Sequence, residues 1–139
     1  MFQHPMLNDV VRRAEIGLCV LLAAADGDVS ESEIGALSSR VGRLVGDDYP
    51  AIAIGMIVEG EITKMSELGP ERYVRTLVER LPEPRRATAL RGALVVACAD
   101  GLAPEEESMF RDVATELGIP GIDAEAMLQD VRAGLPSSP

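Results

Sequence analysis

Two short acidic segments hold the side chains of this chain that are best suited to chemistry. Each segment begins at the aspartate of an Ala-Asp-Gly sequence that ends an apolar run, and each carries four carboxylates and no basic residue within eight positions. The carboxylates are Asp26, Asp28, Glu31 and Glu33 in the first segment and Asp100, Glu105, Glu106 and Glu107 in the second. Such crowding of like charges is unfavourable unless water, a cation or a basic partner screens it. Oxygen-rich loops suit hard divalent cations, so the candidate ions are Ca²⁺, Mg²⁺ and Mn²⁺.

The spacing does not match an EF-hand. Counted from Asp26, the position that requires glycine is Glu31, and the closing glutamate position is Leu37. Helix capping is the alternative role, because a glutamate in a first turn interacts favourably with the helix dipole, by a few tenths to about 1 kcal/mol. Capping accounts for Glu33 and for the glutamates after Pro104. It does not account for the two aspartates that end the preceding helices, where negative charge is disfavoured.

Helical periodicity dominates the chain, and no segment alternates with period two. We expect seven helices, which makes the protein all-α, in a single domain over residues 1–133 with a disordered tail over 134–139. Asn8 or Asp9 caps the first expected helix, a Ser30–Glu33 capping box opens the second, and Asp123 caps the last. The expected helices run from residue 8 or 9 to about 26, from 30 to about 45, from 50 through 58, from 70 to 81, from about 85 to 99, from 104 to 117, and from 123 through 131.

An internal repeat connects the two acidic segments. A shift of 74 positions places Ile16 on Leu90 and Asp26 on Asp100, and a one-residue gap then aligns Glu33 with Glu106. The repeat predicts two helical hairpins of similar plan, packed about a pseudo-twofold axis in one compact bundle.

Composition and charge exclude several classes of function. The net charge of −10 argues against nucleic acid and anionic membranes as partners. The longest apolar run, residues 16–25, is shorter than the roughly 20 residues that cross a bilayer, and no secretory signal is present, so we expect a cytoplasmic protein without membrane insertion. Cys19 and Cys98 lie in apolar runs and are expected to be buried free thiols. Other proteins are the expected partners, and self-association as a homodimer is left open.

Catalysis is not expected. The only histidine is His4, and the chain has no phosphate-binding glycine loop, no zinc-ligand spacing and no Ser-His-Asp set. Two further features are open to two interpretations each. The basic cluster Arg80, Arg85, Arg86 and Arg91 is a solvated helix face or a docking patch, and the apolar segment 52–58 is a core helix or an exposed partner groove.

The duplicated motif resembles the TerB-like tellurite-resistance family. The resemblance is carried by Ala25-Asp26-Gly27 with Glu33 and Leu37, and again by Ala99-Asp100-Gly101 with Glu106 and Phe110, and it spans roughly residues 8–117. It implies an all-helical fold and paired acidic clusters that are proposed to bind metal. Carried over by position, the ligands are Asp26, Glu33, Asp100 and Glu106, with Glu31, Glu105 and Glu107 less directly placed. Leu102 stands where the first segment has Asp28, so the first site should be the stronger.

The resemblance implies a stress-response or tellurite-associated role, without implying chemistry on tellurite. A related domain also serves as an interaction module in DnaJ-type co-chaperones that are anchored in membranes. Two hypotheses follow. The chain is a TerB-like protein that binds a divalent cation through two acidic helix-loop-helix motifs, or it is a helical protein–protein interaction scaffold whose carboxylates serve only as helix caps.

Overall fold

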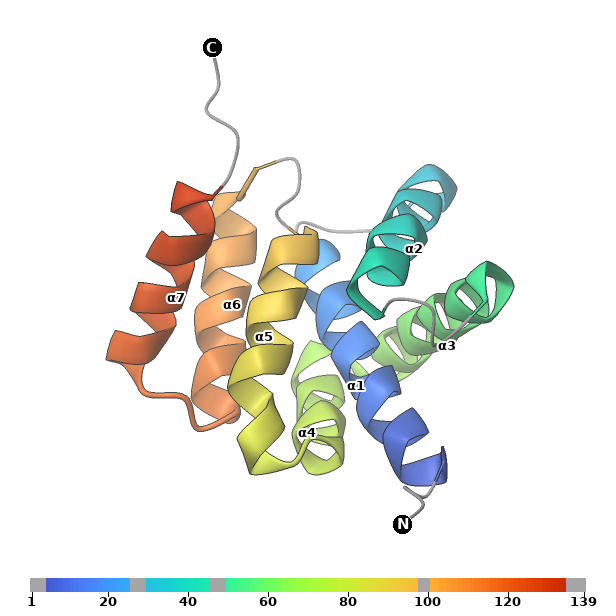
Figure 1. Ribbon diagram of the computed structural model, residues 1–139, viewed down its shortest axis with the longest axis horizontal. Helices are drawn as coiled ribbons and strands as arrows, with labels where there is room; N and C mark the ends of the chain where they lie inside the picture. The colour runs from blue at the N-terminus through green and yellow to red at the C-terminus, as the bar shows by residue number, and fades with distance from the viewer. Residues whose placement is uncertain (1–4, 26–29, 46–49, 98–100, 135–139) are drawn as a thin grey trace.

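The computed structural model describes residues 5–25, 30–45, 50–97 and 101–134, which form seven α-helices and no strand. Figure 1 shows α1 and α5 side by side at the centre of the bundle, with α2 and α3 on one side and α6 and α7 on the other. The expected all-α fold is confirmed. The helices are α1 (Pro5–Ala23), α2 (Glu31–Val45), α3 (Ala51–Leu68), α4 (Pro70–Arg80), α5 (Glu83–Ala97), α6 (Pro104–Glu116) and α7 (Gly121–Ala133).

The helix contacts follow the predicted repeat. The most extensive helix–helix contact is between α1 and α5. The helix that follows each acidic motif crosses to the other half, since α2 contacts α5 while α6 contacts α1. The third helix of each half packs on the first two. In the first half α3 packs on α1 and α2, and in the second half α7 packs on α5 and α6. This reciprocal pattern is what a pseudo-twofold axis between α1 and α5 produces. Helix α4 has no counterpart in the second half and packs against α1, α3 and α6.

Helix α1 runs through the middle of the core. Every residue from Ala14 to Leu22 is buried, Cys19 among them, because neighbouring helices surround this stretch on all sides. A helix enclosed in this way is apolar on nearly all sides, and the buried charged residue of this stretch is Glu15. Tyr73 and Phe110 supply the largest buried side chains. Cys98 lies outside the described residues.

Three helix starts differ from the sequence-based expectation. Helix α1 already begins at Pro5, so Asn8 and Asp9 lie inside it, and α5 begins at Glu83 with Pro84 as its second residue. Proline is tolerated in a first turn because the N–H groups there have no intrahelical acceptor. For the same reason Pro120 precedes α7 directly, without a side-chain cap, which places Asp123 in the first turn. Helix α7 ends at Ala133, and residues 135–139 of the expected tail lie outside the described residues.

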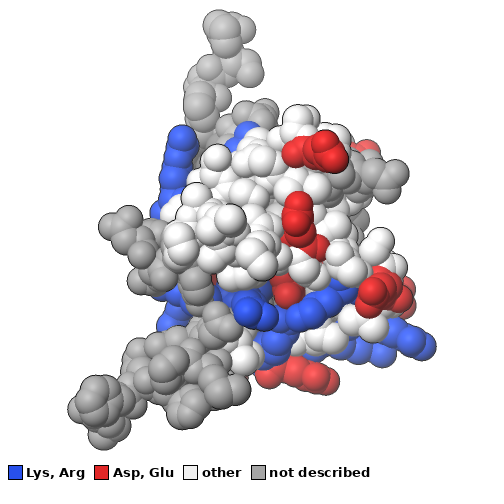
Figure 2. Space-filling model, turned by 90° about the vertical axis from the view of Figure 1, so that its right-hand side faces the viewer, with Lys and Arg blue, Asp and Glu red and all other residues white. Residues whose placement is uncertain are grey.

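The apolar segment 52–58 is only partly a core segment. Ile54 and Val58 are buried, whereas Ile52 and Met56 are 76% and 69% exposed on the opposite face of α3. Figure 2 views the side of the molecule formed by α2 and α3. It shows an upper surface of mostly uncharged side chains with a few Asp and Glu side chains, above a band of Lys and Arg side chains. The expected core helix is therefore confirmed for one face of α3.

Candidate functional site

The described parts of both acidic motifs lie at one end of the α1–α5 pair. Helices α1 and α5 end at Ala23 and Ala97, and the following helices α2 and α6 begin at Glu31 and Pro104. Since α2 crosses to α5 and α6 crosses to α1, the first turns of α2 and α6 are brought to the same end of the bundle. The pairing predicted from the repeat is thus realised in space.

A hollow of about 470 Å³ lies between the two motifs, and we call it the motif hollow. It takes one glutamate from each motif, Glu33 from α2 and Glu106 from α6. The remaining wall consists of small and apolar residues and one arginine, namely Ala23, Ala36, Leu37, Arg40, Ala97, Gly101, Leu102 and Ala103. Two carboxylates thus line one small space, although they are far apart in the sequence.

Glu33 belongs to the capping box that the sequence predicts. Its backbone N–H donates to Ser30 Oγ at 3.3 Å, and the Ser30 N–H donates in return to Glu33 Oε1 at 3.4 Å. The Ser30 hydroxyl also donates to Glu33 Oε1, at 2.9 Å. Both bonds that the carboxylate accepts use Oε1, so the second carboxylate oxygen, Oε2, is not part of the cap.

The second motif has only half of this cap. The Ala103 N–H donates to Glu106 Oε1 at 3.0 Å, but Ala103 has no side-chain oxygen to accept a bond from the first turn of α6. Pro104 occupies the first helical position and Gly101 has a φ of 119°, a left-handed conformation that favours glycine. The two motifs therefore share one plan but differ in capping.

The other candidate glutamates do not line the motif hollow. Glu31 and Glu105 are exposed to solvent. Glu107 forms ion pairs with Arg132 of α7 and, at 3.5 Å, with Arg111 of its own helix α6. Asp26, Asp28 and Asp100 lie outside the described residues. The structure therefore brings Glu33 and Glu106 together and separates Glu31, Glu105 and Glu107 from them.

Arg40 lines the same hollow and was not predicted. Helical spacing could have revealed it, because Arg40 follows Glu33 by seven residues and so lies two turns along the same face of α2. Arg40 thus adds a positive charge to the wall that the two glutamates share.

The glutamates of the hollow fit part of a divalent-cation site. Hard cations take several carboxylate or carbonyl oxygens, and Glu33 and Glu106 offer carboxylates from two directions. Within the described ranges, no group of three or more His, Cys, Asp or Glu side chains is placed to hold a metal. A complete ligand set would therefore draw on the three aspartates of the loops as well.

Sequence reasoning missed a buried carboxylate on α3. Glu61 is 2% exposed, and its Oε1 accepts hydrogen bonds from the Tyr73 hydroxyl at 2.8 Å and from Arg80 at 3.0 Å. Lys64 approaches its other oxygen at 3.3 Å. Burial, together with the charge of Glu61, raises the pKa of Tyr73. Glu61 is thus held as a structural anion that joins α3 to α4.

A second buried carboxylate lies on α1. Glu15 pairs with Arg85 at 3.0 Å and with Arg12 at 3.4 Å. Arg86 donates to the backbone carbonyls of Val78, Leu81 and Leu117, which end α4 and α6, and Arg91 forms an ion pair with Asp130. Every arginine of the predicted basic cluster therefore has a partner within the fold, which does not favour the docking-patch interpretation.

None of the helices among the described residues combines the length and the apolar character that crossing a bilayer requires.

A comparison with known protein families identifies the family to which this chain belongs. The family model described as "Tellurite resistance protein TerB" matches residues 12–129, which is most of the chain and includes both acidic motifs. Searches of curated proteins and of solved structures gave no significant match. The duplicated Ala-Asp-Gly motif, the all-helical bundle and the family match agree, and the chain belongs to the TerB tellurite-resistance family.

Proposed function

We propose that this chain is a non-enzymatic, cytoplasmic stress-response protein that is associated with tellurite resistance and binds a divalent cation between its two acidic motifs. One observation carries the proposal, namely that Glu33 of the first motif and Glu106 of the second line the same hollow. Family membership supports the association with tellurite resistance. The candidate ions are Ca²⁺, Mg²⁺ and Mn²⁺, because all three take oxygen ligands.

The residues of the hollow have distinct roles in this proposal. Glu33 and Glu106 supply carboxylates from the first turns of α2 and α6, and their capping bonds fix where those carboxylates lie. Asp26, Asp28 and Asp100 are the further candidate ligands. A bound cation would screen the repulsion among these charges. Without it, Arg40 is the positive charge that the described residues place in the hollow.

Thermal unfolding of chelator-stripped protein tests the proposal. An ion at about 100 times its dissociation constant stabilises a fold by about 2.7 kcal/mol, a shift of several degrees for a domain of this size. We expect one of the three ions at millimolar concentration to raise the melting temperature, and the Asp26→Asn, Asp100→Asn double variant to lose that response. The absence of a shift with every ion would reject cation binding.

A helical interaction scaffold is the second candidate function, and the capping geometry favours it. Glu33 and Glu106 each bond to a backbone N–H at the start of their own helix, and Glu107 is paired with arginines. In this case the double variant would leave stability unchanged or raise it slightly, because repulsion is relieved, and no ion would alter melting.

A further inference from the structure

A second hollow lies away from the acidic motifs, between α4 and α6, and we call it the α4–α6 groove. Its volume is about 770 Å³, and both helices contribute charged side chains to its walls. Val74 and Met109 provide an apolar floor, with Leu68 at one end. Neither acidic motif takes part in it, so the groove is independent of the proposed cation site.

The charged side chains that line the groove are exposed and are free to meet an external partner. Glu71, Arg72, Arg75, Asp112 and Glu116 have no side-chain hydrogen bond or ion pair within the part of the chain that the structure describes. By contrast, the arginines of α5 and the last arginine of α4 all bond within the protein. The groove thus gathers exposed charges that pair with no other side chain among the described residues.

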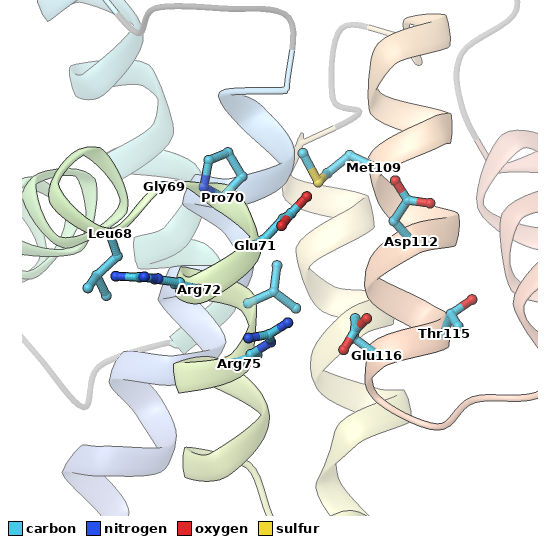
Figure 3. A pocket seen from close by; sticks show the side chains of 11 residues that line it. Leu68, Gly69, Pro70, Glu71, Arg72, Arg75, Met109, Asp112, Thr115 and Glu116 are labelled. Atoms are coloured by element: carbon cyan, nitrogen blue, oxygen red, sulfur yellow. The ribbon is translucent and has the colours of Figure 1, made fainter.

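The sign of the charge inside the groove is mainly negative. Figure 3 shows Glu71, Asp112 and Glu116 directed into the space between the two helices, whereas Arg72 points away from α6. Arg75 is the arginine that remains on the groove side of α4, at the end where Glu116 lies. A ligand that complements this surface must bring positive charge together with an apolar group that covers the floor.

We propose that the α4–α6 groove docks a basic segment of another protein, in which lysine or arginine side chains flank an apolar one. The basic groups would meet Glu71, Asp112 and Glu116, and the apolar side chain would cover Val74 and Met109. Apolar grooves between helices with charged rims recognise amphipathic segments in this way. The net charge of −10 favours the approach of such a segment over long distance.

The probe is a fluorescein-labelled 15-residue peptide of leucine and lysine, with its leucines at helical spacing. Binding is followed by fluorescence anisotropy in the presence of chelator, so that no metal contributes. We expect the Asp112→Asn, Glu116→Gln variant to bind about tenfold more weakly, since it loses two charge contacts. Arg75→Gln should bind several times more tightly, because it removes the opposing cation.

The matched control is the Glu59→Gln, Glu83→Gln variant, which makes the same change in net charge at exposed positions outside the groove. It should bind the peptide within about twofold of the wild type, because the contacts are local. Amide shifts in NMR spectra should map to residues 68–75 and 109–116. The proposal is overturned if the control loses as much affinity as the groove variant, if the shifts map elsewhere, or if no peptide binds.

Two further probes test which features of the lysine peptide the groove recognises. Spermidine carries positive charge without an apolar side chain, and a peptide with glutamate in place of lysine reverses the charge. Both should bind far more weakly than the lysine peptide. If spermidine binds as tightly, the apolar floor has no role and the docking of a protein segment is rejected. Because the variants leave both motifs intact, this outcome is distinct from failure of the proposed cation site.

Discussion

Glu15 and Glu61 lie inside the bundle, whereas Glu33 and Glu106 line the hollow between the motifs. The buried pair is held by arginines from other helices, Glu15 by Arg85, 70 positions away, and Glu61 by Arg80, 19 positions away. The glutamates of the hollow each bond to a backbone group three residues away in their own motif. The buried carboxylates therefore join helices together. Those of the hollow take part in capping their own helix starts.

The largest expected effect on stability comes from removing Arg80, the ion-pair partner of the buried Glu61. In Arg80→Met the buried carboxylate of Glu61 loses its guanidinium partner. Removing one partner of a buried ion pair lowers the free energy of unfolding by several kcal/mol. We expect the free energy of unfolding to fall by about 3 kcal/mol in urea denaturation. Arg72→Met, at an unpaired exposed arginine, should change it by less than about 0.5 kcal/mol. Equal losses of unfolding free energy in the two variants would show that the Glu61–Arg80 pair makes no specific contribution to stability.

Gly17→Ala introduces a steric clash into the same buried region around Glu61. A Cβ atom at Gly17 would lie 2.5 Å from Tyr73 Oη, 2.6 Å from Leu77 Cδ2 and 3.0 Å from Glu61 Oε1. Overpacking of this kind costs about 1–3 kcal/mol. Gly60→Ala is the matched control, because nothing lies within 4 Å of its Cβ position and alanine favours a helix interior by about 0.5–1 kcal/mol. Urea denaturation should therefore give changes of opposite sign, and a loss in both variants would contradict this packing.

Capping distinguishes the two motifs at smaller cost. Ser30→Ala removes the oxygen that accepts the Glu33 N–H and should lower the free energy of unfolding by about 1 kcal/mol. Ala103→Ser supplies the oxygen that the second motif lacks and should raise it, by up to about 1 kcal/mol. Thermal unfolding at fixed pH measures both changes. If Ala103→Ser has no effect, the second motif does not need the missing half of the cap.

The last effect concerns Cys19 and is absent at neutral pH. Burial, with a contribution from the charge of Glu15, raises the pKa of Cys19 to about 12 in the folded state. A thiol in the unfolded chain ionises near pH 8.5, so the unfolded state loses its proton first and is favoured as the pH rises. The contribution to stability is therefore intact below about pH 8 and declines from about pH 9 upward. Unfolding at pH 8 and pH 10 should show a smaller decline for Cys19→Ala than for the wild type, and equal declines would contradict the shift.

Local patterns explain what could be predicted from the sequence. Seven helices and the Ser30–Glu33 cap follow from spacing within single segments. The repeat follows from comparing two segments 74 positions apart, and it predicted that the two motifs pack about a pseudo-twofold axis. The ion pairs of Glu15 and Glu61 were missed because their main partners are distant in sequence. A signal for Glu61 was nevertheless present, since it falls on the inward face of α3 at helical spacing from Ile54 and Val58. The groove between α4 and α6 has no such signal, because it arises only when two helices from different parts of the chain pack together.

The central claim is that both motifs contribute to one cation site. Its most direct test is the stoichiometry of Mn²⁺ binding to chelator-stripped protein, measured by electron paramagnetic resonance of the free ion. Glu33→Gln and Glu106→Gln are suitable variants, because glutamine keeps the capping bond and removes the charge, and Glu31→Gln and Glu105→Gln are their controls outside the hollow. We predict one ion per chain, weakened by either hollow variant and little changed by either control. Two ions per chain, each lost in a different variant, or no saturable binding at all, would contradict the claim.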